Sequence, residues 1–169
     1  MGQQQLLLLV LGIVIVGIAI VVGINAYAEN SVKSNYDALL QDALRISSDA
    51  QAWKSKPELF GGQDDDLKQD QADFTGAIFS AWGYSQQNIG SSGECYLNLN
   101  GEYIIDGTAA GLSVIGQSDQ HQNQVSLDVT GTLEPDVNLV QDELVQGGAA
   151  VDDGAVQALL ALTCTPAGS

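Results

Sequence analysis

Acidic side chains supply most of the groups in this sequence that could do chemistry. A polar stretch holds five of them, Asp64, Asp65, Asp66, Asp70 and Asp73, and carboxylate oxygens are the ligands that Ca²⁺ prefers. The stretch lacks the alternating spacing, the central glycine and the closing Glu of an EF-hand loop. Two carboxylates in a cleft can also hydrolyse a glycoside, but the spacing here selects no pair. We therefore expect no metal site and no cofactor, and cation binding by residues 64–73 stays open.

Nucleophilic and basic groups are scarce. The one histidine, His121, lies in the polar stretch GQSDQHQNQ, where such a residue is more often solvated than catalytic. The sequence contains no Gly-x-Ser-x-Gly, no Gly-x-Gly-x-x-Gly and no phosphate-binding loop. One histidine and two distant cysteines are also too few for a zinc site. The sequence therefore predicts a protein that is not an enzyme.

The two cysteines, Cys95 and Cys164, form an even pair in a chain with an export-like segment. This pattern favours a disulfide between them. Two buried free thiols are the alternative.

Charge is distributed unevenly. The formal net charge is −16, and the five basic residues all fall between Lys33 and Lys68. Such a chain is a poor partner for nucleic acid, whose phosphates need Lys and Arg. It is equally poorly suited to binding anionic lipid headgroups through a basic patch. The acidic remainder predicts a well-solvated surface.

An apolar segment of nineteen residues, Leu6–Ile24, follows three glutamines near the start of the chain. It is long enough to cross the hydrocarbon core of a bilayer as a helix. Ala26-Tyr27-Ala28 would suit cleavage of a secretory signal peptide, but the apolar run is long and no basic residue precedes it. A single-pass membrane anchor is a further alternative.

The helical pattern continues beyond the apolar segment. Apolar side chains recur in steps of four and three, with polar residues opposite, and no glycine or proline occurs between Ile24 and Lys56. We expect one helix over residues 1–56, apolar over 1–25 and amphipathic over 26–56; two helices with a break near Asn25 are the alternative. The amphipathic part should pack on the rest of the protein through Val32, Tyr36, Leu39, Ala43, Ile46, Ala50 and Trp53.

The remaining residues predict an acidic connecting region over 57–90, of mixed structure, and an antiparallel sheet domain over 91–169. Asn100-Gly101 between two alternating runs is a strong hairpin signal. LSVIG and NQVSLDVTGTL supply two more strands, with Val125, Leu127, Val129 and Leu133 expected on one face. The residues from Val137 to Thr163 are ambiguous. The predicted fold class is α+β, a long helix packed on a sheet of four or more strands.

This organisation resembles that of mature type IV pilins and their pseudopilin relatives. The resemblance rests on the apolar N-terminal helix from Leu6 onward, its amphipathic continuation and the two-cysteine sheet domain. Pilins of this family carry a glutamate at mature position 5, where this chain has Gln5 if Met1 is the first residue. They often have a proline near position 22, where this chain has Val22.

The resemblance implies a structural subunit of an extracellular helical filament. It implies an inner-membrane precursor, a prepilin peptidase, an assembly machinery and methylation of the terminal amine. The partner is then a further copy of the same chain, and a minor pseudopilin, or an anchored exported binding module or hydrolase, is the alternative. The residues expected to act in assembly are Met1, Gln3, Gln4, Gln5, Leu6, Leu7, Leu8, Leu9, Val10, Leu11, Gly12, Gly17 and Gly23.

Overall fold

The fold is α+β, as the sequence predicts. The structure is a computed structural model that describes residues 2–64, 70–118 and 123–143. One helix, α1 (Gly2–Ser55), packs through its second half on a five-stranded antiparallel sheet. The chain forms two compact units, residues 1–34 and residues 35–169. We call the described residues 35–143 the head.

Helix α1 runs for 54 residues without interruption. Asn25 lies inside it, which excludes the alternative of two helices with a break there. The helix continues because no glycine or proline interrupts the sequence after Gly23. Pro57 follows its end, and the backbone of Gly61 then adopts the left-handed conformation that favours glycine (φ 79°).

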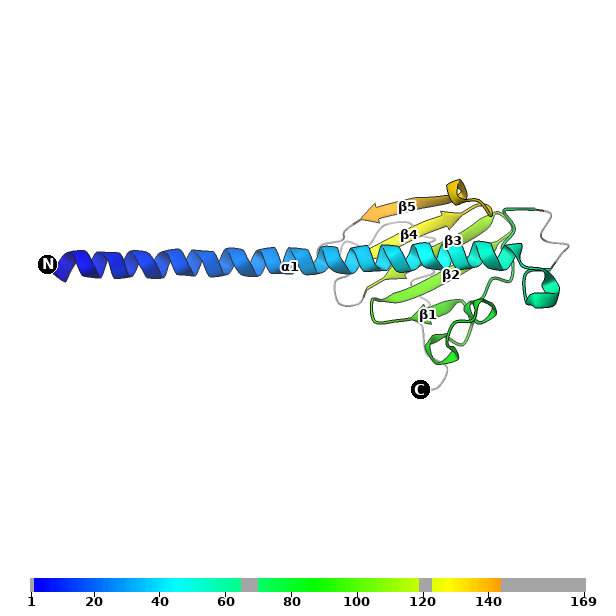
Figure 1. The fold of residues 1–169 in the computed structure, drawn as a ribbon, viewed down its shortest axis with the longest axis horizontal. Helices are drawn as coiled ribbons and strands as arrows, with labels where there is room; N and C mark the ends of the chain where they lie inside the picture. Colours follow the sequence, from blue (N-terminus) through cyan, green and yellow to red (C-terminus); the bar gives the residue numbers. More distant parts are fainter. Residues whose placement is uncertain (1, 65–69, 119–122, 144–169) are drawn as a thin grey trace. The chain divides into compact units, whose positions relative to one another are not determined.

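The strands follow one another in space in the order of the sequence. They are β1 (Cys95–Leu97), β2 (Glu102–Thr108), β3 (Gly111–Gln117), β4 (Gln124–Val129) and β5 (Val137–Glu143). Every neighbouring pair is antiparallel. Asn100-Gly101 lies in the β1–β2 connection, as the hairpin signal predicts. Figure 1 shows the head part of α1 lying across one face of this sheet.

The core lies between α1 and that face. On the helix, six of the seven residues expected to pack on the head are buried: Tyr36, Leu39, Ala43, Ile46, Ala50 and Trp53. The seventh, Val32, is partly buried. The sheet contributes alternate residues of β2, β3 and β4, as the period of a strand requires: Tyr103, Ile105, Leu112, Val114, Val125, Leu127 and Val129.

The connecting region adds short 3₁₀ helices and an aromatic cluster. The helices are η1 (Glu58–Phe60), η3 (Phe79–Trp82) and η4 (Gln86–Asn88), and η5 (Glu134–Asp136) precedes β5. Phe79 makes edge contacts with the rings of Trp82 and Tyr84, at centroid distances of 5.4 Å and 5.2 Å. Trp82 also lies 6.4 Å from the ring of Trp53 on α1. This cluster fixes the connecting region against the helix.

Two leucines that continue an alternating pattern lie outside the strands: Leu133, expected on one face with Val125, Leu127 and Val129, and Leu99, which alternates with Asn98 after Cys95 and Leu97. Strand β4 ends at Val129, so Leu133 falls in the connection to β5 and is 59% exposed. Strand β1 ends at Leu97, and Leu99 occupies the turn with its side chain fully exposed. In both cases the chain turns before the alternation in sequence ends.

Candidate assembly segment and its attachment to the head

The apolar segment Leu6–Ile24 is helical and uncovered. Its large side chains are between 50% and 69% exposed in the isolated chain. The helix is long and apolar enough to cross a membrane, by length and composition. Covering a large apolar side chain contributes about 1.5–3 kcal/mol, so a segment of this length stabilises any assembly or bilayer that buries it.

The other residues expected in assembly lie on the same helix. Gln3, Gln4 and Gln5 are helical and exposed, and Met1 lies outside the described residues. At Gly12, Gly17 and Gly23 a methyl group would meet no atom within 4 Å in the isolated chain. These glycines therefore leave shallow, open places along an otherwise bulky apolar surface.

Asp42 is the principal polar contact between α1 and the sheet. Its Oδ2 accepts hydrogen bonds from Asn98 Nδ2 (2.8 Å), Asn100 Nδ2 (2.7 Å) and the hydroxyl of Tyr103 (2.9 Å). These partners come from the β1–β2 turn and from β2. Burial of the Tyr103 hydroxyl raises the pKa of Tyr103 well above its ordinary value, and the neighbouring Asp42 carboxylate raises it further. The three donors hold the β1–β2 hairpin to the helix.

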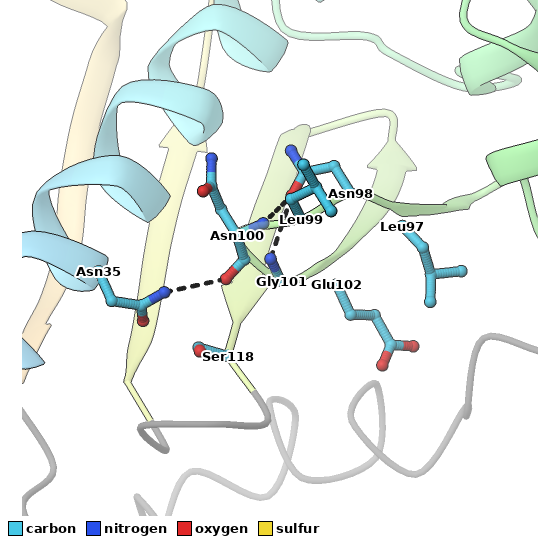
Figure 2. A pocket seen from close by; sticks show the side chains of 8 residues that line it. All are labelled: Asn35, Leu97, Asn98, Leu99, Asn100, Gly101, Glu102 and Ser118. Carbon is cyan, nitrogen blue, oxygen red and sulfur yellow. Dashed lines mark hydrogen bonds between the residues drawn. The ribbon is translucent and has the colours of Figure 1, made fainter.

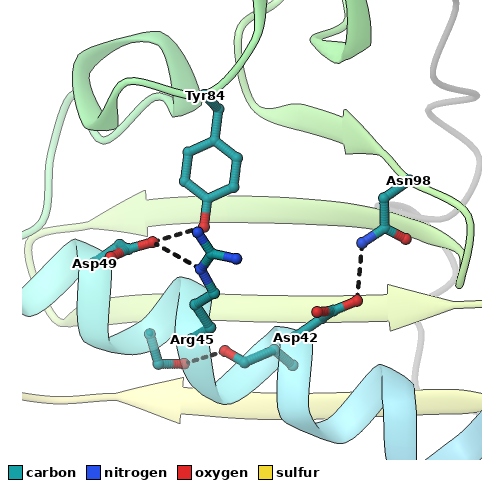
Figure 3. A network of polar contacts seen from close by, with 7 residues as sticks. Asp42, Arg45, Asp49, Tyr84 and Asn98 are labelled. Atoms are coloured by element: carbon teal, nitrogen blue, oxygen red, sulfur yellow. Dashed lines mark hydrogen bonds and ion pairs between the residues drawn. The ribbon is translucent and has the colours of Figure 1, made fainter.

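A second carboxylate two turns further along α1 holds the connecting region. The hydroxyl of Tyr84 donates to Asp49 Oδ2 at 2.7 Å, as Figure 3 shows beside the Asp42–Asn98 contact. Burial raises the pKa of Tyr84, and the hydrogen bond to Asp49 raises it further. Arg45 Nε lies 4.0 Å from the same oxygen, but its side chain is 77% exposed. An exposed pair of this kind contributes little.

Asn35 and Gln51 add side-chain contacts at the two ends of the docked helix. Asn35 Nδ2 donates to the carbonyl of Asn100 (3.2 Å), and its Oδ1 accepts from Asn123 Nδ2 (3.0 Å). Gln51 Nε2 donates to the carbonyls of Gly131 (3.0 Å) and Leu133 (2.9 Å). Polar contacts therefore follow the docked helix along its whole length.

Lys54 is a buried cation at the end of the helix, 2% exposed. Its ammonium donates to Gln63 Oε1 at 2.9 Å and to the carbonyl of Asp73, and lies 5.0 Å from the ring centre of Phe74. Burial lowers the pKa of Lys54, and the nearby acids Asp73 and Asp70 oppose that shift. The lysine therefore bonds α1 both to Gln63, just before the 64–73 stretch, and to Asp73 at its end.

Close approach of the helix to the sheet requires two glycines. A methyl group on Gly101 would lie 2.2 Å from the carbonyl oxygen of Gln117 and 2.9 Å from Leu39 Cδ2. A methyl group on Gly116 would lie 3.0 Å from the ring of Tyr103. Both positions lie beneath Leu39, so the hairpin signal at Asn100-Gly101 also marks a packing contact.

A small pocket lies beside the β1–β2 turn (Figure 2). Most of the polar groups around it bond to each other. Asn98 Oδ1 accepts from the backbone amides of Asn100 (2.8 Å) and Gly101 (3.1 Å), and Asn35 bonds the Asn100 carbonyl. The described residues that line it are Asn35, Leu97, Asn98, Leu99, Asn100, Gly101, Glu102 and Ser118. Of these described residues, Glu102 alone has a titratable side chain.

The groups with potential chemistry are not brought together in the described part of the chain. Residues 2–64, 70–118 and 123–143 contain no group of three or more His, Cys, Asp and Glu side chains that could hold a metal ion. Asp65, Asp66 and His121 lie outside the described residues. Cys95 is buried at the start of β1, and its predicted partner Cys164 lies outside the described residues, so their pairing stays a prediction.

Sequence reasoning missed the attachment residues. Asn35, Asp42 and Asp49 have the positions of a solvent-facing polar side of the helix, yet each bonds a residue outside the helix. The partners of Asp42 lie 56, 58 and 61 positions away along the sequence. No pattern of neighbouring residues predicts contacts over such separations. The one available signal was the cluster of asparagines at 98 and 100.

Comparison with known proteins returned no family model, no curated protein and no solved structure that matches this chain.

Proposed function

We propose that this chain is a structural subunit of an extracellular, type IV pilus-like filament. In the assembled fibre the apolar segments of many copies pack together, and the acidic heads face the solvent. The observation that carries the proposal is the uncovered apolar helix that continues without a break into the docked helix of the head. The chain acts as a building block and catalyses no reaction.

The uninterrupted helix favours a filament over a simple anchor. A membrane anchor needs only a spanning segment, and a flexible linker to its domain would serve it equally well. Here the same helix continues into the head, where hydrogen bonds of Asp42, Asp49 and Lys54 hold it to the β1–β2 turn and to the connecting region. Repeated head-to-tail contacts of such a unit do not close, and therefore extend into a helical polymer.

Where Met1 is the first residue of the mature chain, its terminal ammonium is costly to bury in an apolar bundle without a partner. We propose that Gln3, Gln4 and Gln5 then solvate this ammonium with side-chain amides from neighbouring copies. Gln5→Leu should reduce the yield of filaments, while Gln5→Glu should preserve it. Normal assembly of Gln5→Leu would remove this part of the proposal.

Filament assembly is tested by a substitution that adds side-chain volume to the apolar segment and keeps that segment apolar. Gly17→Leu keeps the segment apolar, so membrane insertion of the precursor should be unchanged. Because packed helices are sensitive to added volume whereas lipid is not, the filament yield should fall. Val16→Leu, a small change on the same helix, is the matched control. Sheared surface fractions, imaged and identified by N-terminal sequencing, provide the measurement.

The alternatives differ in abundance and in oligomeric state. A minor pseudopilin would be a trace component of the fraction, whereas a major subunit is its bulk. An anchored binding module or hydrolase, favoured only by the length of the apolar segment, would remain a detergent-soluble monomer. Absence of this chain from any surface filament would refute the proposal.

A further inference from the structure

Three large apolar side chains are the most exposed ones in the head. Leu99 is fully exposed in the β1–β2 turn, and Leu59 and Phe60, neighbours in η1, are 90% and 75% exposed. A single exposed apolar side chain is ordinary, but an adjacent pair on one turn marks a candidate contact surface. We call residues 56–62, which carry this pair, the tip.

The backbone holds the tip in a defined turn. The amide of Phe60 donates to the carbonyl of Pro57 (2.9 Å), and the amide of Gly61 donates to the carbonyl of Glu58 (2.9 Å). Gly61 has a positive φ of 79°, which glycine adopts without strain. Because the turn is already ordered, a partner that buries Leu59 and Phe60 loses little affinity to the ordering of this segment.

The tip and Leu99 lie at opposite ends of the head. Asn35, at the start of the docked helix, donates to the carbonyl of Asn100 beside Leu99 (3.2 Å), whereas the tip follows the end of α1 at Ser55. Residues 35–55 of the helix separate these two ends by about 30 Å, at about 1.5 Å per residue. A contact between the tip and the β1–β2 turn therefore requires two copies of the chain.

The pocket beside the β1–β2 turn suits an apolar guest (Figure 2). Its volume is about 140 Å³, and a protein cavity of about 150 Å³ is large enough to bind benzene. The side-chain amides of Asn98 and Asn100 donate to Asp42, so an apolar guest does not deprive them of their partner. Leu97 and Leu99 supply apolar contacts in the lining. One aromatic side chain therefore fits this pocket in size and in polarity.

Charge favours the tip as the surface that approaches a second copy. The tip carries one cation, Lys56, and one anion, Glu58, so its formal charge is zero. Residues 70–143 contain acidic side chains but no Lys or Arg, and two such surfaces repel each other. The pocket is lined by the carboxylate of Glu102, which a neutral tip with an exposed lysine can approach without that repulsion.

We propose that the tip of each copy places Phe60 in the pocket of a second copy, with Leu59 against the Leu99 of that copy. The inference rests on the proposed function, because a filament repeats copies in one orientation and so brings opposite ends of their heads together. The two surfaces differ from each other, so the contact does not close and repeats from copy to copy. It joins the heads, in addition to the packing of the apolar segments.

Photocrosslinking in purified filaments tests this contact. A benzoylphenylalanine in place of Phe60 should form adducts with residues 95–102 of a second copy, a peptide that cleavage after Glu94 and Glu102 releases. The same probe in place of Leu133, an exposed leucine between β4 and β5, is the matched control and should not label that peptide. Adducts of the Phe60 probe confined to other peptides or to a foreign protein, or equal labelling by the Leu133 probe, would overturn the proposal.

Leu99→Asp tests the pocket side of the contact. Because Leu99 is fully exposed, the unfolding of the isolated chain should be unchanged by this substitution. In filaments the adduct of the Phe60 probe should fall at least about fivefold, since the burial of a leucine side chain against the tip is lost. An unchanged adduct yield would refute the proposal.

A cysteine pair separates this inference from the proposed function. Phe60→Cys combined with Leu99→Cys should give, on oxidation of filaments, a ladder of linked copies that neither single variant gives. Filaments that form normally but give neither the adduct nor the ladder would contradict the tip contact and leave the filament proposal standing. Absence of filaments of this chain would refute the proposed function, and the tip contact with it.

Discussion

The attachment of α1 to the sheet depends on Asp42, and its removal should weaken the head measurably. The carboxylate accepts three hydrogen bonds, one of them from Tyr103, whose side chain is fully buried. In Asp42→Ala the two asparagine amides can turn to water, but the Tyr103 hydroxyl is left without this acceptor. An orphaned buried donor costs about 1–3 kcal/mol, and bonds to a charged group contribute about 1.5–3 kcal/mol each when buried.

Because Asp42 is only half-buried, part of that contribution is lost to water. We expect the free energy of unfolding to fall by about 2–4 kcal/mol in Asp42→Ala and by about 1–2 kcal/mol in Asp42→Asn, which keeps the shape and one acceptor. Urea unfolding of the detergent-solubilised chain, followed by tryptophan fluorescence, measures both. Trp53 lies on α1 and Trp82 on the connecting region, 6.4 Å apart, so their emission reports the docking of the helix.

A double-mutant cycle separates the contact from general disruption. Asp42→Asn and Tyr103→Phe should be coupled by about 1 kcal/mol, because each removes the same hydrogen bond. Asp37→Asn, an exposed acid on the same helix, should show no coupling with Tyr103→Phe. Unfolding of Asp42→Ala at the same urea concentration as the unmodified chain, or equal coupling of Asp37 and Asp42 to Tyr103, would contradict this role of Asp42.

Three further predictions concern the remaining contacts of the docked helix. Tyr84 and Tyr103 hold their protons more tightly in the folded state than in the unfolded one, because both pKa values are raised. Stability should therefore be intact below pH ~10 and fall above it, by up to about 1.4 kcal/mol per pH unit for each tyrosine. Lys54→Ala should destabilise the head by about 2–3 kcal/mol, and Lys54→Met by less, since the apolar stem remains. Gly101→Ala should cost about 2 kcal/mol or more, because its methyl group would overlap a backbone carbonyl.

Each of these has a control and an outcome that contradicts it. Unfolding between pH 10.5 and 12 is compared in Tyr84→Phe and Tyr103→Phe, either of which should reduce the slope by about one proton; an unchanged slope in both would refute the assignment. For the lysine, the exposed Lys56→Met should be neutral, and an equal loss in both would point to surface charge instead. For the glycine, Gly23→Ala lies in open space and should not destabilise the helix.

Local order along the chain was enough to predict several features of this protein. The apolar segment, the unbroken helix and its buried stripe follow from residue type and spacing along one helix. The Asn100-Gly101 turn follows in the same way from two adjacent residues. These features do not depend on contacts with distant parts of the chain, because backbone geometry alone fixes which side chains share a face.

The contacts between these elements could be read only from the folded structure. Asp42 and Asp49 look like solvent-facing charges until the fold brings Asn98, Tyr103 and Tyr84 beside them. Hydrogen bonds between residues more than thirty positions apart leave no period in the sequence. The same is true of the sheet face away from α1, where Ile104 and Ile115 are neighbours only through strand pairing. The register of the strands, together with the alternation of side chains along each strand, places these two residues on the face opposite the helix.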